Sequence, residues 1–142
     1  MAIFNPRFED SYARLFGPGV TLDEHADAFF IEFYRRFLAS ERVGALFAHT
    51  DMNRQIAMLK HSLFYIVSYY VTNSPSAELN RLSEFHRGLE LEVDMFDEWL
   101  DALIHTVAES DPEADEATLL AWCWAMTPGI TYMRLGVGGG LA

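Results

Sequence analysis

Residues 53–71 read NRQIAMLKHSLFYIVSYYV, and this stretch decides the class of the fold. One set of its apolar residues recurs mainly at steps of three and four: Ile56, Leu59, Leu63, Ile66, Val67 and Tyr70. That spacing places them on one face of an α-helix of about five turns, because an α-helix repeats every 3.6 residues. A face this long must pack against other helices, so the stretch predicts a helical core.

The rest of the chain repeats the pattern between breaks rich in glycine, proline, asparagine and acidic residues. The breaks are FGPGV (16–20), TNSPS (72–76), SDPEADE (110–116) and the tail GVGGGLA (136–142). Strand signals are weak throughout. Besides 53–71, helices are therefore predicted at 8–16, from 21 to about 40, at 78–89, from about 96 to 107 and from about 117 to 132.

Capping residues and one connection complete the outline. Thr21 with Glu24 forms a capping-box pattern, and Asp51 can cap the helix that follows it. The segment ERVGALFAHTD (41–51) is predicted as a connection that carries Phe47. The sequence thus predicts an all-α fold of six to seven helices in a single domain, 1–142. In it, 1–20 form a short first helix and a Gly/Pro turn, and 136–142 form a frayed tail.

Composition and charge exclude several classes of function. The chain has 142 residues, of which 51% are hydrophobic, and its net charge is −11. This charge repels phosphate backbones and anionic lipids, so we expect neither nucleic acid nor a membrane surface as a partner. The single cysteine, Cys123, cannot form an internal disulfide. The first residues lack the features of a secretory leader, and a cytoplasmic protein is expected.

One of the five histidines lies on an apolar stripe. His86 shares a helical face with Leu79, Leu82 and Leu89, and the bulky Phe85 precedes it. A histidine in this position is either a core imidazole that is hydrogen-bonded to a carbonyl or a ligand to metal or haem iron. The position alone leaves both interpretations open.

Motifs for other chemistries are missing from the sequence. There is no HxxxH, HExxH or CxxC pattern for zinc, no CxxCH for covalent haem, no GxSxG nucleophile elbow and no phosphate-binding loop before a helix. Pairs of carboxylates, such as Asp97 with Glu98, lie on polar faces and are expected to be solvated. Hydrolase and nucleotide-binding functions are therefore not favoured.

Five sequence elements follow one another in a telling order: FYRRFL (33–38), LF (46–47), QIAML (55–59), His86 and VDMF (93–96). This order resembles the globin family, and specifically the single-domain bacterial haemoglobins and the haem domain of flavohaemoglobins, over roughly residues 25–135. The resemblance implies a globin fold that sandwiches haem b. It implies a distal tyrosine, a phenylalanine stacked on the porphyrin, a distal polar residue, an apolar residue one turn later and a proximal iron ligand: Tyr34, Phe47, Gln55, Leu59 and His86. Three further residues near His86 are expected to line the cofactor site: Leu82, Leu91 and Phe96.

The chain departs from the flavohaemoglobin pattern on the proximal side. That pattern supports the histidine with a tyrosine and a glutamate, but Phe96 stands at the tyrosine position and no acidic residue follows Glu116. We therefore expect a nearly neutral imidazole, held at most by a backbone carbonyl. In the last helix, Trp122, Trp124 and Met126 are expected either to pack near the histidine or to form plain core. Pro128 is unusual at its place in that helix.

The resemblance implies reversible binding of O₂, CO or NO, with oxygen transport as the favoured role. Tyr34 and Gln55 would donate hydrogen bonds to O₂. The alternatives are a gas or redox sensor that acts through a partner chain, an NO dioxygenase served by an external reductase, and a helical protein without haem or with a bilin on Cys123. The sequence leaves the oligomeric state open, with a homodimer among the options.

Overall fold

The computed structural model describes residues 5–17, 26–89 and 91–137. Within these residues the fold is all-α, as the sequence predicts, and contains no strand. The helices are α1 (Pro6–Phe16), α2 (Asp27–Phe37), α3 (Glu41–Leu46), α4 (Met52–Thr72), α5 (Ala77–Arg87), α6 (Met95–Ser110) and α7 (Glu116–Val137). Of the helices in these ranges, none combines the length and the apolar character that a membrane span requires.

Side chains cap four helices at their N-terminal ends, and Asp115 does so for α7 by accepting from the Thr118 N–H over 2.8 Å. Asn5, Asp51 and Ser76 each accept a hydrogen bond from a backbone N–H in the first turn of α1, α4 and α5. These bonds satisfy donors that a helix end otherwise leaves unpaired. The predicted cap at Asp51 is confirmed, whereas Thr21 and Glu24 lie outside the described residues.

The differences from the sequence prediction that matter most concern α3 and α7. The segment 41–51 is not a plain connection, because Glu41–Leu46 forms α3; six residues are too few to show a helical period in the sequence. Helix α7 runs through Pro128 to Val137, past the predicted end near residue 132, so the predicted tail begins inside the helix. Packing of α7 against α1, α4, α5 and α6 explains why the proline does not end it.

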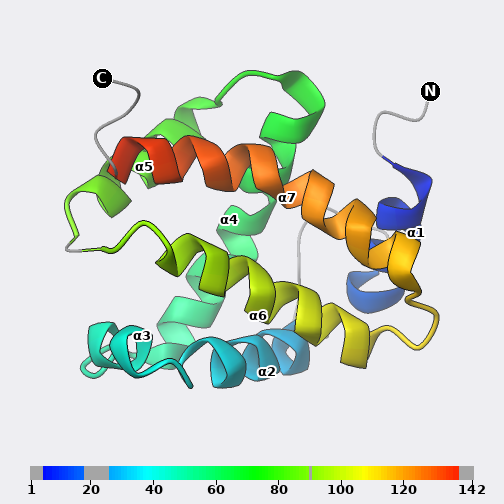
Figure 1. The fold of residues 1–142 in the computed structure, drawn as a ribbon, viewed down its shortest axis with the longest axis horizontal. Helices are drawn as coiled ribbons and strands as arrows, with labels where there is room; N and C mark the ends of the chain where they lie inside the picture. Colours follow the sequence, from blue (N-terminus) through cyan, green and yellow to red (C-terminus); the bar gives the residue numbers. More distant parts are fainter. Residues whose placement is uncertain (1–4, 18–25, 90, 138–142) are drawn as a thin grey trace.

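Helix α7 is the central element of the fold. Figure 1 shows α6 and α7 passing in front of α4. In this view α2 lies below α6, on the side away from α7, and α1 lies at one end of α7. The backbones of α4 and α7 touch where they cross, since a Cβ added at Gly129 would lie only 2.6 Å from the carbonyl oxygen of Ile66. Glycine is therefore required at this crossing.

Aromatic rings fill the core between α1, α2 and α7. Trp122, Phe30 and Phe33 are fully buried. Phe16 of α1 stacks on Phe30 of α2 with ring centroids 5.6 Å apart, and the Trp122 ring lies edge-on to Phe16 at 6.3 Å. These contacts fix α2, which carries Tyr34, against the body of the molecule.

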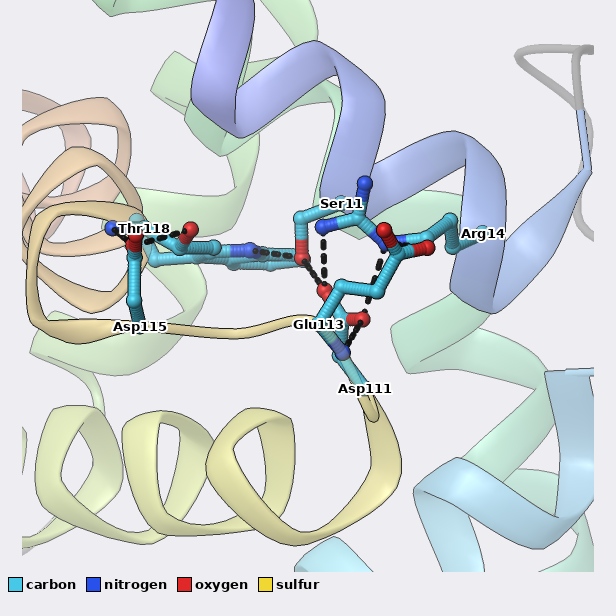
Figure 2. A network of polar contacts seen from close by, with 7 residues as sticks. Ser11, Arg14, Asp111, Glu113, Asp115 and Thr118 are labelled. Carbon is cyan, nitrogen blue, oxygen red and sulfur yellow. Dashed lines mark hydrogen bonds and ion pairs between the residues drawn. The ribbon is translucent and has the colours of Figure 1, made fainter.

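A buried carboxylate joins α1 to the turn between α6 and α7 (Figure 2). Asp111 accepts hydrogen bonds from Ser11 at 2.6 Å and from Nε of Arg14 at 2.8 Å, and Trp122 in turn donates to Ser11. Burial alone would raise the pKa of Asp111, but the bonds from Arg14 and Ser11 outweigh it and the pKa lies below its ordinary value. The SDPEADE turn is thus not wholly solvated.

We expect the Asp111→Asn substitution to destabilise the protein by on the order of 3 kcal/mol at pH 7. An amide has only one acceptor oxygen, so it cannot accept the hydrogen bonds of both Arg14 and Ser11 as the carboxylate does. A carboxyl with a lowered pKa stabilises the fold above its unfolded pKa, and this contribution is lost as the pH falls. The difference between the wild type and the variant should therefore shrink below about pH 4. Urea denaturation of both proteins at pH 7 and at pH 3.5 measures the difference in their free energy of unfolding. A difference that did not depend on pH would contradict the role assigned to the ionised Asp111.

Candidate functional site

Tyr34 lies on the buried face of α2 and is 4% exposed. Burial raises the pKa of its hydroxyl to about 12, and the hydrogen bond from Gln55 opposes that rise. The tyrosine is therefore neutral near pH 7 and keeps its proton. It can act as a hydrogen-bond donor but not as an anion.

Gln55, in the first turns of α4, donates from Nε2 to the Tyr34 hydroxyl oxygen over 3.1 Å. The glutamine is half-buried, so it is not simply an exposed polar residue. Since the tyrosine oxygen accepts this bond, its own proton remains available for a third group. The structure brings together the two residues that the sequence proposed as distal hydrogen-bond donors.

Apolar side chains surround this pair. Phe47, which directly follows α3, lies edge-on to Tyr34 at 6.0 Å and to Phe37 at 6.1 Å. Leu59, one turn after Gln55 on α4, is 7% exposed. The Tyr34 hydroxyl is thus a polar group in an otherwise apolar environment, where a hydrogen bond is stronger than in water.

His86 lies in the last turn of α5 and is half-buried. Its Nδ1 is 2.8 Å from the carbonyl oxygen of Leu82, the backbone contact that the sequence predicts. Because a carbonyl only accepts, Nδ1 carries the proton and Nε2 presents its lone pair. Burial lowers the pKa of His86, although the bond to Leu82 opposes this, so the ring is neutral near pH 7. A neutral imidazole with a fixed tautomer is ready to ligate a metal.

The proximal surroundings of His86 are apolar. The Phe96 ring is 6.2 Å from the imidazole and offers no hydrogen bond. Leu82 and Leu91 are partly buried against the core. Glu92, a candidate for an acidic support of the histidine, instead forms an ion pair with Arg42. The described residues therefore support His86 only through a backbone carbonyl.

Aromatic contacts connect the two halves of the site. Phe33, beside Tyr34 with ring centroids 4.9 Å apart, lies edge-on to Trp99 of α6 at 5.5 Å. Phe96 is one helical turn before Trp99 and contacts His86. Helix α6 thus contacts both parts of the site, through Trp99 beside Phe33 and through Phe96 beside His86.

Three large apolar side chains are more exposed than the sequence predicts. Phe85 is 60% exposed and Leu89 is 42% exposed, so they do not bury His86 as the apolar stripe suggested; α5 ends at Arg87, before Leu89. Trp124 is 56% exposed, so it is not part of the core, whereas Trp122 and Met126 are fully buried.

Arg42 is a residue that the sequence analysis missed. Its guanidinium pairs with Glu92, Asp94 and Glu98, which ties α3 to the corner before α6 that carries Leu91. The hydrogen bonds that Arg42 donates to Asp94 and Glu98 raise the pKa of Arg42 above its ordinary value. In the sequence, the cluster of acidic residues at 92–98 is the feature that indicates a basic partner.

The donor set indicates which kind of cofactor the site can hold. Across the described ranges, no group of three or more histidine, cysteine or acidic side chains is arranged to hold a metal ion. His86 offers one nitrogen, which suits haem iron because the porphyrin supplies four others. Direct contact between α4 and α5, which carry Gln55 and His86, is sparse. The apolar residues and the single nitrogen donor therefore fit a haem.

A cleft of about 250 Å³ lies elsewhere, between α2 and α6. Its lining includes Arg36, Glu98, Asp101 and His105 and none of the proposed haem-contacting residues. Charged walls of both signs make it a poor site for an apolar macrocycle.

Comparison with known proteins gives one match. No protein-family model matches the chain, and no curated protein matches it. A solved structure from Pseudomonas aeruginosa PAO1, described as structurally highly homologous to a human hemoglobin, is 33% identical and superposes with a TM-score of 0.78. The match covers 92% of this chain and 95% of that one.

Proposed function

Because the chain belongs to the globin family, we propose that it binds haem b with His86 as the iron ligand and binds a diatomic gas beside Tyr34. The observation that carries the proposal is the state of His86: neutral, half-buried and held through Nδ1 by the Leu82 carbonyl. This arrangement directs the Nε2 lone pair toward a ligand-binding role.

The proximal residues hold and orient this nitrogen. The Leu82 carbonyl fixes both the tautomer and the tilt of the His86 ring, and the side chains of Leu82, Leu91 and Phe96 supply apolar contact for a porphyrin face. Haem supplies the iron that binds O₂, CO or NO. Burial of the apolar macrocycle against these side chains adds hydrophobic stabilisation to the single ligand bond.

The distal residues select the gas. Gln55 donates to the Tyr34 oxygen, which leaves the tyrosine proton to be donated to the ligand. O₂ draws negative charge when it binds a ferrous centre, so a donor stabilises it more than it stabilises the less polar CO. Reversible O₂ binding is the function that this arrangement supports best, with Phe47 and Leu59 keeping water out.

Titration of the purified protein with haem tests the proposal. We expect the Soret absorption to rise to an endpoint of about one haem per chain. Tryptophan fluorescence should be quenched at the same time, since Trp99 of α6 contacts Phe33, the neighbour of Tyr34. Bovine serum albumin serves as a control for non-specific uptake. A linear rise without an endpoint would contradict haem binding at a defined site.

The absence of acidic support in the described surroundings of His86 predicts the strength of the iron–histidine bond. A neutral imidazole donates less electron density to iron than an imidazole paired with a carboxylate. We expect a low iron–histidine stretching frequency in the ferrous, unligated protein, nearer to oxygen-storage globins than to peroxidases, and slow peroxidase turnover. Resonance Raman spectroscopy measures the frequency. A peroxidase-like value would favour an enzyme over a carrier.

A further inference from the structure

Helix α7 exposes a continuous stripe of uncharged side chains. The exposed positions recur at helical spacing: Ala117, Leu120, Trp124, Thr127 and Thr131, which we call the α7 stripe. Leu120 is 51% exposed and Trp124 is 56% exposed, whereas Trp122 on the opposite side of the helix is fully buried. Leu120 and Trp124 lie at adjacent turns of this exposed face, and neighbouring exposed apolar side chains of this size favour contact with a partner.

The α7 stripe is also an uncharged face of one helix in a strongly acidic molecule. No lysine, arginine, aspartate or glutamate occurs from Ala117 to Met133, although the chain as a whole carries a net charge of −11. Two copies of this chain repel each other over most of their surfaces. They can approach closely where the charges are missing, and this favours a second copy as the occupant of the stripe.

The stripe is complementary to itself under two-fold symmetry. Trp124 stands at its midpoint, seven residues from Ala117 and seven from Thr131. In an antiparallel pair of α7 helices, Trp124 meets Trp124 of the second copy, Leu120 lies near Thr127, and Ala117 lies near Thr131. Both copies then use the same patch, as a closed dimer requires.

We propose that this protein forms a homodimer through the α7 stripe, with Trp124 at the two-fold axis. The stripe is about 21 Å long at 1.5 Å per residue. A contact confined to one face of one helix is small compared with the interfaces of stable dimers, so we expect the dimer to dissociate on dilution. Salt strengthens it, because screening weakens the repulsion between two acidic chains while the apolar contact remains.

Sedimentation velocity at about 100 μM and about 1 μM protein tests the dimer, with the haem-loaded and the haem-free protein run separately. At the higher concentration we expect a mass approaching twice the 16.2 kDa of the chain. Trp124→Glu and Leu120→Glu should each weaken association at least tenfold. Ile31→Glu is the matched control, because Ile31 is 59% exposed on α2, outside the stripe, and the same charge is introduced.

Three outcomes would overturn the proposal. The first is a monomer at 100 μM in both low and high salt, which would leave the stripe to a different protein. The second is a dimer that both Trp124→Glu and Leu120→Glu leave intact, and the third is equal loss of the dimer in Ile31→Glu. Circular dichroism of each variant checks the fold, and none of these results depends on whether haem binds at His86.

Discussion

The His86→Ala variant is expected to lose stoichiometric haem at ordinary protein concentrations. The substitution removes the nitrogen that, in our proposal, ligates the iron, while the apolar contacts of Leu82, Leu91 and Phe96 remain. Hydrophobic contact alone retains haem only weakly. The haem content after gel filtration, measured from the Soret absorption and normalised to protein concentration, should fall well below that of the wild type.

His105→Ala is the matched control for this experiment. The Nδ1 of His105 also lies 2.8 Å from a carbonyl four residues earlier, that of Asp101, but the His105 side chain is exposed on α6. The two substitutions therefore remove the same local bond, and only one removes the proposed iron ligand. Full haem retention by His86→Ala with an unchanged Soret band would refute the assignment.

The Tyr34→Phe variant should release O₂ about tenfold faster or more, with a much smaller change for CO. A hydrogen bond to a charged acceptor contributes about 1.5–3 kcal/mol, and the hydroxyl of buried Tyr34 has its proton free for such a bond because Gln55 occupies its oxygen. Stopped-flow displacement of each gas measures the two rates in the same protein preparation.

Carbon monoxide provides the internal control, since phenylalanine preserves the ring and its contacts with Phe33 and Phe47. Gln55→Leu should accelerate O₂ release less than Tyr34→Phe, because it leaves the tyrosine donor in place. Equal acceleration of both gases in Tyr34→Phe would show that the ring acts only by its bulk.

Much of the fold can be predicted from the sequence because its helices are long and amphipathic. The apolar period over 53–71 locates α4 to within one residue at either end. The short α3 contains fewer than two turns and leaves no such signal. The end of α7 is hidden by Pro128 and Gly136, whose unfavourable local effects are outweighed by packing.

The sequence predicted that Tyr34 and Gln55 act together and that a carbonyl holds His86, and the structure shows both contacts. The burial of individual side chains could not be inferred from residue order. The pairing of Gln55 with Tyr34 follows from two helices that cross, and the carbonyl contact of His86 follows from its own helix. The burial of Asp111 cannot be predicted from the sequence, because nothing local distinguishes one carboxylate of an acidic turn from the next. The prediction that Trp124 forms core is wrong: residues two apart on a helix differ by about 200°, so Trp122 and Trp124 cannot face the same core.

Membership of the globin family is shown, whereas a specific similarity to flavohaemoglobins is not. The chain belongs to the globin family, and its similarity to the flavohaemoglobin haem domain stays a prediction from Tyr34, Gln55 and His86. Phe96 beside His86 removes one partner of the proximal support seen in that group, and Glu92 is held by Arg42 instead. These two observations favour gas binding over oxidative chemistry.

The visible spectrum of a His86→Gly variant, recorded with and without imidazole, tests whether the His86 imidazole holds the haem. Glycine leaves space for a free imidazole to replace the missing side chain. We predict that the variant shows little Soret absorption alone and regains a wild-type-like, saturable spectrum when imidazole is added. A variant that holds haem equally well in the absence of imidazole, with the wild-type spectrum, would contradict this prediction.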